Sequence, residues 1–381
     1  MSTSVSDTVE VLVTLALQGL PASFIPETTE FAQTVRAVRT ASGVELVREG
    51  ASLRYSAIVA LGLARLEVPE QEAVLGDLSV RDLVSVIRKR AVSSDDPGAV
   101  ALAAWAAAEA GGSPDLALLE RLGSILAARR SLATVDTAWM LTAAVASLRA
   151  ADAATAEPAA GIARVTRDLL LEAQGRHGIF PHALPAASLG RWRAHIGCFA
   201  DQVYPIQALA RLAAYSDDPA ALACANRAAA RICTLQGVAG QWWWHYDARD
   251  GSVVERFPVY CVHQHAMAPM ALFDLATAAG DDHRAAIVRG LSWLDTHPEV
   301  LPDLVSQGRG QVWRKVGRRE PAKAARKLSA VTTSLRPGWH LPGLQIVLPP
   351  NQVDYECRPY ELGWLLYAWR SPNFLTDAEQ R

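Results

Sequence analysis

The sequence predicts an all-α protein, an (α/α)6 toroid in which a ring of six inner helices is surrounded by six outer helices. Ala-rich segments with apolar residues at helical spacing recur along the chain and are separated by Gly, Pro, Asp and Ser. The alternating pattern of strands is almost absent. Hydrophobic residues make up 50 % of the chain and charged residues 20 %, which is enough apolar material for a large core.

Six segments are apolar on nearly every side, as expected of helices that are buried all round. In chain order they are Arg54–Leu66, Pro97–Ala110, Val135–Leu148, Val203–Tyr215, His263–Ala278 and Pro359–Trp369.

Between them lie segments that combine an apolar stripe with Arg, Lys, Asp and Glu, as expected of an outer layer facing water. These are Val80–Ala91, Leu116–Arg129, Gly161–Ala173, Pro219–Leu235, His283–Asp295 and Ala322–Leu335.

Repeated helical hairpins that form an open stack need polar caps at both ends, whereas a closed ring buries both ends against each other. We therefore expect closure, with an open α-solenoid as the alternative. The whole chain, residues 1–381, is predicted to form one domain. It consists of a helical lead-in (1–50), the helical ring (51–371) and a tail (372–381).

The formal charge of −2 provides no overall field for nucleic acid or an anionic membrane, so we expect neither partner. The five cysteines are odd in number and include no CxxC pair, which favours a reducing, cytoplasmic location. The apolar stretch Val11–Leu20 is short and follows Asp7 and Glu10, so it predicts a helix rather than a signal peptide. No segment has the roughly 20 apolar residues of a membrane-spanning helix.

Polar and aromatic residues gather where the predicted inner helices begin. In a closed ring these N-terminal ends meet around one opening, where their positive helix dipoles favour electron-rich ligands. The candidate groups there are Asp136, Asp201, Tyr204, Gln264, Arg358, Tyr360 and Glu361. Helix capping is the simpler explanation for several of them.

Two loops share the pattern Gln-xxx-Gly-x-aromatic, Gln174–Phe180 and Gln236–Trp242, and a looser copy spans Gln307–Trp313. This pattern resembles the QW repeat of the terpenoid cyclase and protein prenyltransferase toroids. The resemblance implies that each Gln ties a helix end while the aromatic residue packs on the neighbouring repeat.

The stretch Asp136-Thr137-Ala138 resembles the end of the Asp-x-Asp-Asp-Thr-Ala motif of type II terpene cyclases. In that family the middle Asp protonates the substrate, and Val135 stands in its place here. Asp136 is therefore either an unorthodox acid or a helix cap.

The richest stretch runs from Trp242-Trp243-Trp244 through His245, Tyr246 and Asp247 to Glu255. Aromatic faces stabilise carbocations and also stack on sugar rings, although packing between repeats is the simpler alternative. Arg191 and Arg193 lie in a long loop with no helical periodicity, which suggests a lid that holds a carboxylate or diphosphate.

The acid and base candidates are Glu255, Tyr260, His263 and His265, because imidazole titrates near neutrality and a carboxylate orients it. We expect no cofactor. Mg²⁺ or Zn²⁺ is a lesser alternative, and zinc at Cys261, His263 and His265 would have to recruit Asp354, Cys357 or His245 as well.

Three functions remain open. The first is a terpenoid-cyclase-like lyase or isomerase that cyclises an isoprenoid by metal-independent protonation. The second is a carbohydrate-active enzyme (glycoside hydrolase, lyase or epimerase) that uses carboxylate, His and Tyr groups on a small sugar substrate. The third is a non-catalytic toroid. The number of titratable groups favours an enzyme, with a slight preference for the first function.

Overall fold

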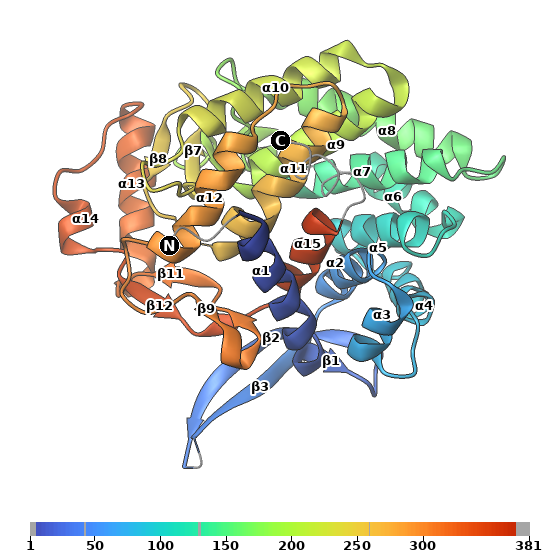
Figure 1. Cartoon of the computed structure of the whole chain (residues 1–381). Helices are drawn as coiled ribbons and strands as arrows, with labels where there is room; N and C mark the ends of the chain where they lie inside the picture. The colour runs from blue at the N-terminus through green and yellow to red at the C-terminus, as the bar shows by residue number, and fades with distance from the viewer. Residues whose placement is uncertain (1–4, 42, 129–130, 259, 371–381) are drawn as a thin grey trace.

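A computed structural model describes residues 5–41, 43–128, 131–258 and 260–370. Six inner helices contact one another in sequence and return to the first, so the ring is closed (Figure 1). They are α2 (Leu53–Leu63), α5 (Pro97–Glu109), α7 (Thr134–Arg149), α9 (Ala200–Ser216), α11 (Ala268–Thr277) and α15 (Pro359–Trp369). A π-helical turn, His263–Met267, precedes α11. The predicted (α/α)6 toroid is confirmed.

Closure occurs where the last inner helix meets the first. A Cβ atom added to Gly62 of α2 would lie 2.3 Å from the carbonyl oxygen of Gly363 in α15. Only glycine allows the two backbones to come so close, which means that the first and last inner helices pack as tightly as consecutive ones.

Local signals fix several helix starts. The Asp96 carboxylate accepts hydrogen bonds from the amides of Gly98 and Ala99, and Pro97 occupies the first turn of α5. Ser79 and Asp82 form a capping box that begins α4 (Val80–Ala91). These caps explain why the predicted starts of both helices agree with the structure.

The outer layer contains α4, α6 (Leu116–Ala128), α8 (Ala156–Ala173), α10 (Pro219–Thr234) and α12 (Arg284–Thr296), as predicted. Arg129, the predicted end of α6, lies outside the described residues. The sixth outer helix is α1 (Val5–Gly19), which packs on α15 and reaches α12 (Figure 1). The prediction of Ala322–Leu335 as the sixth was therefore wrong. That segment is α13 (Ala324–Leu335), which packs instead on the three-stranded sheet β6–β8.

Three loops support this assignment, because each of them follows one outer helix and contacts another. A Cβ on Gly178 would clash with the Arg227 carbonyl of α10, and one on Gly240 with the Arg289 carbonyl of α12. In the third copy, a Cβ on Gly310 would lie 2.9 Å from the Gly19 amide of α1. Each loop thus rests on an outer helix, and α1 is the one that the third loop meets.

The two clean loops bind their outer helices through the same contacts. Nε2 of Gln174 donates to the Cys224 carbonyl of α10 at 2.8 Å, and Nε2 of Gln236 donates to the Ala286 carbonyl of α12 at 2.9 Å. Each Gln oxygen accepts from an arginine one turn later, Arg227 or Arg289. The glutamines therefore join neighbouring repeats.

The predicted helical lead-in, 1–50, is only partly helical. After α1, the strands β2 (Glu30–Thr40) and β3 (Gly43–Ala51) form a long hairpin that projects beyond the ring (Figure 1). Phe31 and Val35 anchor the start of β2 in the core, whereas Val38, Val44 and Val47 are exposed. Alternating β-branched residues favour this hairpin over a helix. The predicted tail, 372–381, lies outside the described residues.

Short elements complete the described chain. The helices are α3 (Val68–Leu75) and α14 (Leu344–Val347), with 3₁₀ turns at Pro21–Ser23, Ala186–Leu189, Gln307–Arg309 and Pro321–Lys323. The remaining strands are β1 (Phe24–Ile25), β4 (Leu132–Ala133), β5 (Ala183–Leu184), β6 (Ile196–Cys198), β7 (His245–Asp247), β8 (Val253–Glu255), β9 (Val305–Ser306), β10 (Gln311–Val312), β11 (Lys315–Gly317), β12 (Gln352–Asp354) and β13 (Glu356–Cys357).

Contacts at both ends of the ring show that the inner helices run in the same direction. At the C-terminal ends, which we call the far end, Glu109 of α5 accepts bonds from Arg211 of α9 and Tyr367 of α15, each at 2.6 Å. The N-terminal ends, which we call the mouth, meet on the opposite side.

Candidate functional site

Asp136 and Arg54 form the centre of the mouth. Arg54, in the first turn of α2, reaches across to Asp136 in the first turn of α7, with 3.0 Å between Nη1 and Oδ1. Its other nitrogens bind Asp96, the cap of α5. The Arg54 side chain is 31 % exposed and that of Asp136 11 %, so Arg54 is partly open to a ligand and Asp136 exposes only a small part of its carboxyl group.

The surroundings of Asp136 favour its protonated form. Burial raises the pKa of this carboxyl above its usual value, and the carboxylates of Asp96 and Asp201 act in the same direction. Arg54 opposes the shift but does not cancel it. A carboxyl with a raised pKa at an accessible position is suited to donate a proton.

Asp201 lies in the first turn of α9, the next inner helix. Its Oδ2 accepts a hydrogen bond from the Cys198 amide at 2.7 Å and lies 2.9 Å from Nδ1 of His182. The hydrogen bond and charge of Asp201 raise the pKa of His182. Asp201 itself is fully buried, whereas the His182 side chain is 40 % exposed. The imidazole therefore links a buried carboxylate to the opening.

Aromatic residues of the inner helices pack beside the Arg54–Asp136 pair. Trp139 of α7 lies under Arg54 and meets Tyr204 of α9 edge-on, with ring centroids 4.9 Å apart. The Tyr204 hydroxyl accepts a hydrogen bond from Trp364, which fixes its orientation. Tyr204 is buried, and burial raises its pKa far above the usual value, so it remains neutral.

A second aromatic pair lies where the ring closes. Tyr55 of α2 packs on Tyr360 of α15 with centroids 4.7 Å apart, and Arg358 donates to the Tyr55 hydroxyl at 2.9 Å. All three side chains are partly exposed. Tyr360 and Arg358, two predicted binding residues, are therefore placed at the mouth.

The turn before α11 occupies the position that Asp201 has in the preceding repeat. Gln202 binds the backbone of Phe180, and Gln264 accepts from the Trp242 amide in the same way, which makes His263 the counterpart of Asp201. The His263 ring packs between Phe199 and Tyr260. Burial lowers the pKa of His263 to about 3, with Arg314 adding to the effect, so the ring is neutral.

His265 lies deeper than His263. It is fully buried, neither ring nitrogen has a hydrogen-bond partner, and burial lowers its pKa to about 3. Tyr260 is partly exposed, and Arg314 lies 4.2 Å from the centre of its ring. Of these three candidates, Tyr260 is the one that a ligand at the mouth reaches.

The three consecutive tryptophans have separate positions. Trp242 is fully buried against Phe199, and Trp243 donates to the Leu235 carbonyl at 2.7 Å. Trp244 lies between His245, stacked at 4.6 Å, and Arg326 of α13, whose Cζ is 3.4 Å from the ring centroid. Trp244 is therefore already in contact with an imidazole ring and a guanidinium group, and Trp243 and Trp244 are both partly exposed.

Glu255 is an ion-pair partner in this structure. Burial on its own would raise its pKa, but the hydrogen bond from His245 and the charges of His245, Arg318 and Arg326 hold the pKa below its usual value. Glu255 contacts Arg318 directly, and both side chains are at most 2 % exposed. An ionised, enclosed carboxylate is poorly placed to donate a proton.

Glu361 is the buried carboxyl of α15. Burial raises its pKa to about 8, although Arg314 opposes this shift from 3.6 Å. Neither carboxyl oxygen has a hydrogen-bond partner. Arg314 instead forms its closer ion pair with Glu356, at 2.9 Å. Glu361 is therefore a neutral acid behind the mouth.

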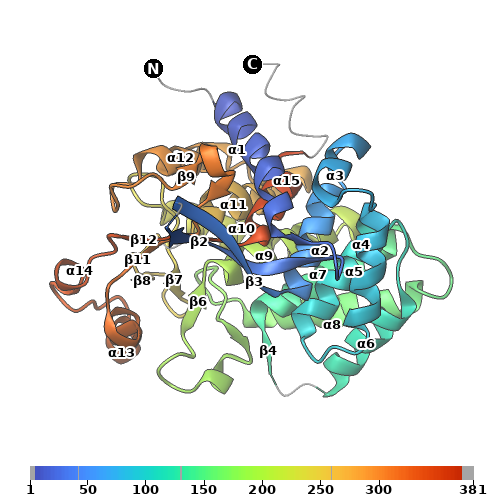
Figure 2. The same ribbon diagram turned by 90° about the horizontal axis from the view of Figure 1, so that it is seen from below.

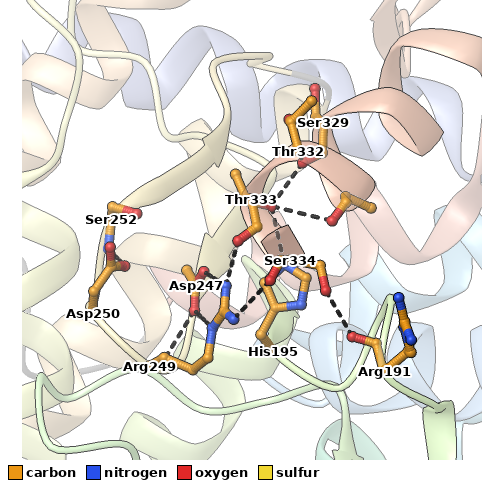
Figure 3. A network of polar contacts seen from close by, with 11 residues as sticks. Arg191, His195, Asp247, Arg249, Asp250, Ser252, Ser329, Thr332, Thr333 and Ser334 are labelled. Carbon is orange, nitrogen blue, oxygen red and sulfur yellow. Dashed lines mark hydrogen bonds and ion pairs between the residues drawn. The ribbon is translucent and has the colours of Figure 1, made fainter. Parts of the chain in front are cut away.

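Helix α13 is fastened to the sheet beside the mouth by a polar network (Figure 3). Arg249 binds the buried carboxylate of Asp247 and donates to the carbonyls of Thr333 and Ser334 at the end of α13. His195 lies 3.0 Å from the Thr333 hydroxyl. Asp247, a predicted binding residue, is thus engaged in holding α13, and Arg326 extends from that helix over Trp244.

The long loop before α9 contributes to the same network. Ser334 donates to the Arg191 carbonyl at 2.9 Å, and the Arg191 guanidinium lies 4.0 Å from the centre of the Trp192 ring. Arg193 is exposed, and its charge acts on His182 and on Arg326. Tyr246 is buried and accepts from the Trp243 amide, a packing contact. The loop therefore places one cation, Arg193, near the mouth.

Several residues of the site were not among the predicted site residues. They are Arg54, Trp139, His182, Cys198, Arg314 and Arg326. Trp139 lies three residues after Asp136, on the same face of its helix, and this spacing was a usable signal. His182 is held near Asp201 by the hydrogen bond from its amide to the Ile196 carbonyl of β6, although the two residues lie 19 positions apart in the sequence.

Within the described residues, one group of three side chains is close enough to hold a metal ion, and it consists of His182, Cys198 and Asp201. The predicted alternative around Cys261, His263 and His265 does not form such a group there. Cys261 donates its thiol to the Trp313 carbonyl, and the two histidines are separated by packing.

The fold and the mouth define an (α/α)6 toroid with an acid pair at the N-terminal ends of its inner helices. No known family profile matches the sequence, and no curated protein does. Solved structures do match. An unsaturated glucuronyl hydrolase specific for heparin shares 11 % identity over 96 % of each chain, with a TM-score of 0.56. A possible member of the GH105 family from Klebsiella pneumoniae shares 10 % identity over 97 % of this chain and 93 % of its own, with a TM-score of 0.55.

An ent-copalyl diphosphate synthase from Streptomyces platensis matches more weakly. Its TM-score is 0.43, at 14 % identity over 85 % of this chain and 51 % of its own. The two stronger matches support the (α/α)6 fold. None of the described helices is long and apolar enough to cross a membrane.

Proposed function

We propose that this protein is a carbohydrate-active hydrolase that acts on an oligosaccharide ending in an acidic sugar, with Asp136 as the proton donor. The observation that carries the proposal is the pair Asp136 and Asp201, in the first turns of adjacent inner helices, with different surroundings. Paired carboxyls whose environments differ are the usual basis of acid and base assignment in glycoside cleavage.

Asp136 supplies the acid because burial raises its pKa while its side chain remains accessible. Asp201 and His182 supply the base. The carboxylate holds the imidazole at 2.9 Å, and the exposed part of that imidazole faces the opening, where it positions the attacking water. Both groups come from the rigid start of a helix or from the strand-supported loop beside it.

Arginines at the mouth favour a substrate that carries a carboxylate. Arg54 and Arg358 are partly exposed at the ends of inner helices, and Arg193 and Arg326 approach from the loop and from α13. Guanidinium groups bind carboxylates in a fixed, bidentate geometry. A uronate sugar fits this set better than a hydrocarbon, whose cations would need open aromatic faces.

The fold neighbour named as an unsaturated glucuronyl hydrolase suggests the first substrate to test. An unsaturated uronyl sugar contains an enol ether, so a single proton added to the double bond generates an oxocarbenium ion that water captures. The product is a hemiketal that opens and releases the adjoining sugar. This reaction requires one acid and one positioned water, which Asp136 and the His182–Asp201 pair provide.

The test is turnover of unsaturated uronyl disaccharides, followed by loss of the ultraviolet absorbance of the conjugated double bond. Saturated uronyl disaccharides and linear isoprenoids are assayed in parallel by mass spectrometry. The D136N variant is expected to lower kcat by about 10²–10⁴-fold, the range for loss of a general acid.

The matched control is D115N. Asp115 has a similar exposure, 10 %, and also pairs with an arginine, but it caps the outer helix α6. Activity retained in D136N, or lost equally in D115N, would exclude Asp136 as the donor. A cyclised isoprenoid product would revive the cyclase hypothesis, and inertness towards every substrate would favour the non-catalytic toroid.

A further inference from the structure

The side chains of His182, Cys198 and Asp201 converge from three short segments. One ligand atom from each, a ring nitrogen, the Sγ and a carboxylate oxygen, all lie within 4.8 Å of one another. Three atoms at such separations lie within about 2.8 Å of a common point, close to zinc–ligand distances of about 2.0–2.3 Å. Small side-chain rotations therefore suffice to bring all three onto one ion.

The backbone holds the three ligands in place before any ion binds. The His182 amide donates to the Ile196 carbonyl of β6 at 2.9 Å, and the Cys198 amide donates to Oδ2 of Asp201 at 2.7 Å. Asp201 is in the first turn of α9. The arrangement is thus set by a strand, a loop and a helix rather than by flexible side chains alone.

An unsatisfied atom points to a missing ligand. The Asp201 side chain is 0 % exposed, and its Oδ1 has no hydrogen-bond partner that would replace water. Buried carboxylate oxygens in native proteins are normally paired or coordinated to a metal. His182, in contrast, is 40 % exposed, which gives an ion a route to the group.

We propose that His182, Cys198 and Asp201 bind Zn²⁺, with the fourth position open to water. One nitrogen, one sulfur and one oxygen suit this borderline-soft ion, and three protein ligands with an open position are typical of reactive zinc sites. Mg²⁺ and Ca²⁺ prefer sets made of oxygen alone, so the thiol selects against both.

Arg193 and Arg54 carry the positive charges that oppose a cation here, since Arg193 acts on His182 and Arg54 acts on the nearby Asp136. Asp136 and Asp201 compensate for them. Where the site also performs the proposed hydrolysis, Zn²⁺ binds the His182–Asp201 pair that acts as the base, and it therefore inhibits turnover. That second consequence rests on the proposed function, whereas binding itself does not.

The experiment is titration of the purified, metal-free chain with Zn²⁺ by calorimetry and with Co²⁺ by absorbance. A thiolate–Co²⁺ charge-transfer band in the near ultraviolet reports the Cys198 ligand directly. We expect one ion per chain, and C198S is expected to remove the band and weaken Zn²⁺ binding at least about 100-fold, because a ligand is lost outright.

The control is C233S, which removes another partly buried thiol, on α10, far from these ligands in the sequence. It is expected to bind Zn²⁺ like the native chain. Equal binding by C198S and the native chain, or no stoichiometric binding at all, would overturn the proposal.

Activity gives a separate readout. Zn²⁺ inhibition of the native enzyme that disappears in C198S supports both proposals together. Stoichiometric Zn²⁺ binding without turnover of any sugar leaves the metal site standing while the hydrolase proposal fails. Turnover that is insensitive to Zn²⁺, together with no Zn²⁺ binding, overturns the metal site and leaves the hydrolase proposal standing.

Discussion

The carboxyl groups at the two ends of the ring have pKa values that are shifted in opposite directions. At the far end, Glu109 accepts hydrogen bonds from Trp105, Arg211 and Tyr367, and it forms an ion pair with Arg65. Burial opposes ionisation there, but Arg211 and Arg65 lower the pKa of Glu109 to about 2. At the mouth, the carboxyl of Glu361 has no hydrogen-bond partner and a pKa of about 8, and that of Asp136 is also raised.

The difference separates a structural end from a reactive one. A carboxylate with every oxygen paired locks helices together and has no proton to give. Carboxyls with raised pKa values are destabilising when ionised and are usually found where function requires them. The far end of the toroid thus fastens the ring through Glu109, whereas the carboxyl groups at the mouth have raised pKa values.

The largest expected effect concerns Glu109. E109A leaves the buried guanidinium group of Arg211 and the partly exposed one of Arg65 without their carboxylate, so we expect a loss of about 3–5 kcal/mol in the free energy of unfolding. Denaturant unfolding measures this loss. Activity per folded molecule is expected to stay within about twofold, and a selective loss of activity without loss of stability would break the distinction between the ends.

The next effect is a pH-dependent gain in stability from E361Q. Burial raises the pKa of Glu361 from an ordinary 4.5 to about 8, so between these values the folded chain holds a proton that the unfolded chain lacks. Stability of the native protein therefore falls as pH rises through this window. Glutamine cannot ionise, and E361Q is expected to be more stable by a few kcal/mol above pH 8 and equally stable near pH 4.5.

Thermal unfolding from pH 4.5 to 8.5 checks this expectation. The control is E356Q, which removes the ion pairs of Glu356 with Arg314 and Arg36 and should lower Tm near neutral pH. A difference between E361Q and the native protein that does not change with pH would argue against a neutral Glu361.

The smallest expected effect concerns the hydrogen bond between α13 and the long loop before α9, beside the mouth. S334A removes one exposed hydrogen bond between α13 and the Arg191 carbonyl, for which we expect about 1 kcal/mol or less. Amide exchange in residues 324–335 should then quicken up to about fivefold. S292A, which removes an exposed bond within α12, should leave that segment unchanged.

Much of the fold followed from the sequence because local signals and burial agreed. Asp96-Pro97 and Ser79 mark helix starts wherever the chain is placed, and the all-round apolar pattern of α5 requires full burial. The amphipathic pattern of α13 predicted a helix equally clearly, but an apolar stripe does not indicate which surface of the protein the helix packs against. Ala330 of α13 packs on Ile196 and Val254 of the sheet, so α1 fills the outer position.

The site was harder to predict because its chemistry depends on neighbours from distant segments. Asp136 and Asp201 were recognisable from their places at helix starts. The ionisation of Glu255 depends on Arg318 and that of Asp136 on Arg54, and neither partner lies nearby in the sequence. Trp244 stacks on His245, its neighbour in the sequence, but it also contacts Arg326, which belongs to the distant helix α13.

Ring closure also has a consequence for biosynthesis. Helices α1 and α2 both pack on α15, while the α2–α15 contact places Gly62 against Gly363. A ribosome makes α15 after all the other helices of the ring, so α1 and α2 emerge long before their partner and expose apolar faces until it is made. We therefore expect the nascent chain, rather than the finished protein, to be the form that is most vulnerable to aggregation. Figure 2 shows how close together those early and late helices finally lie.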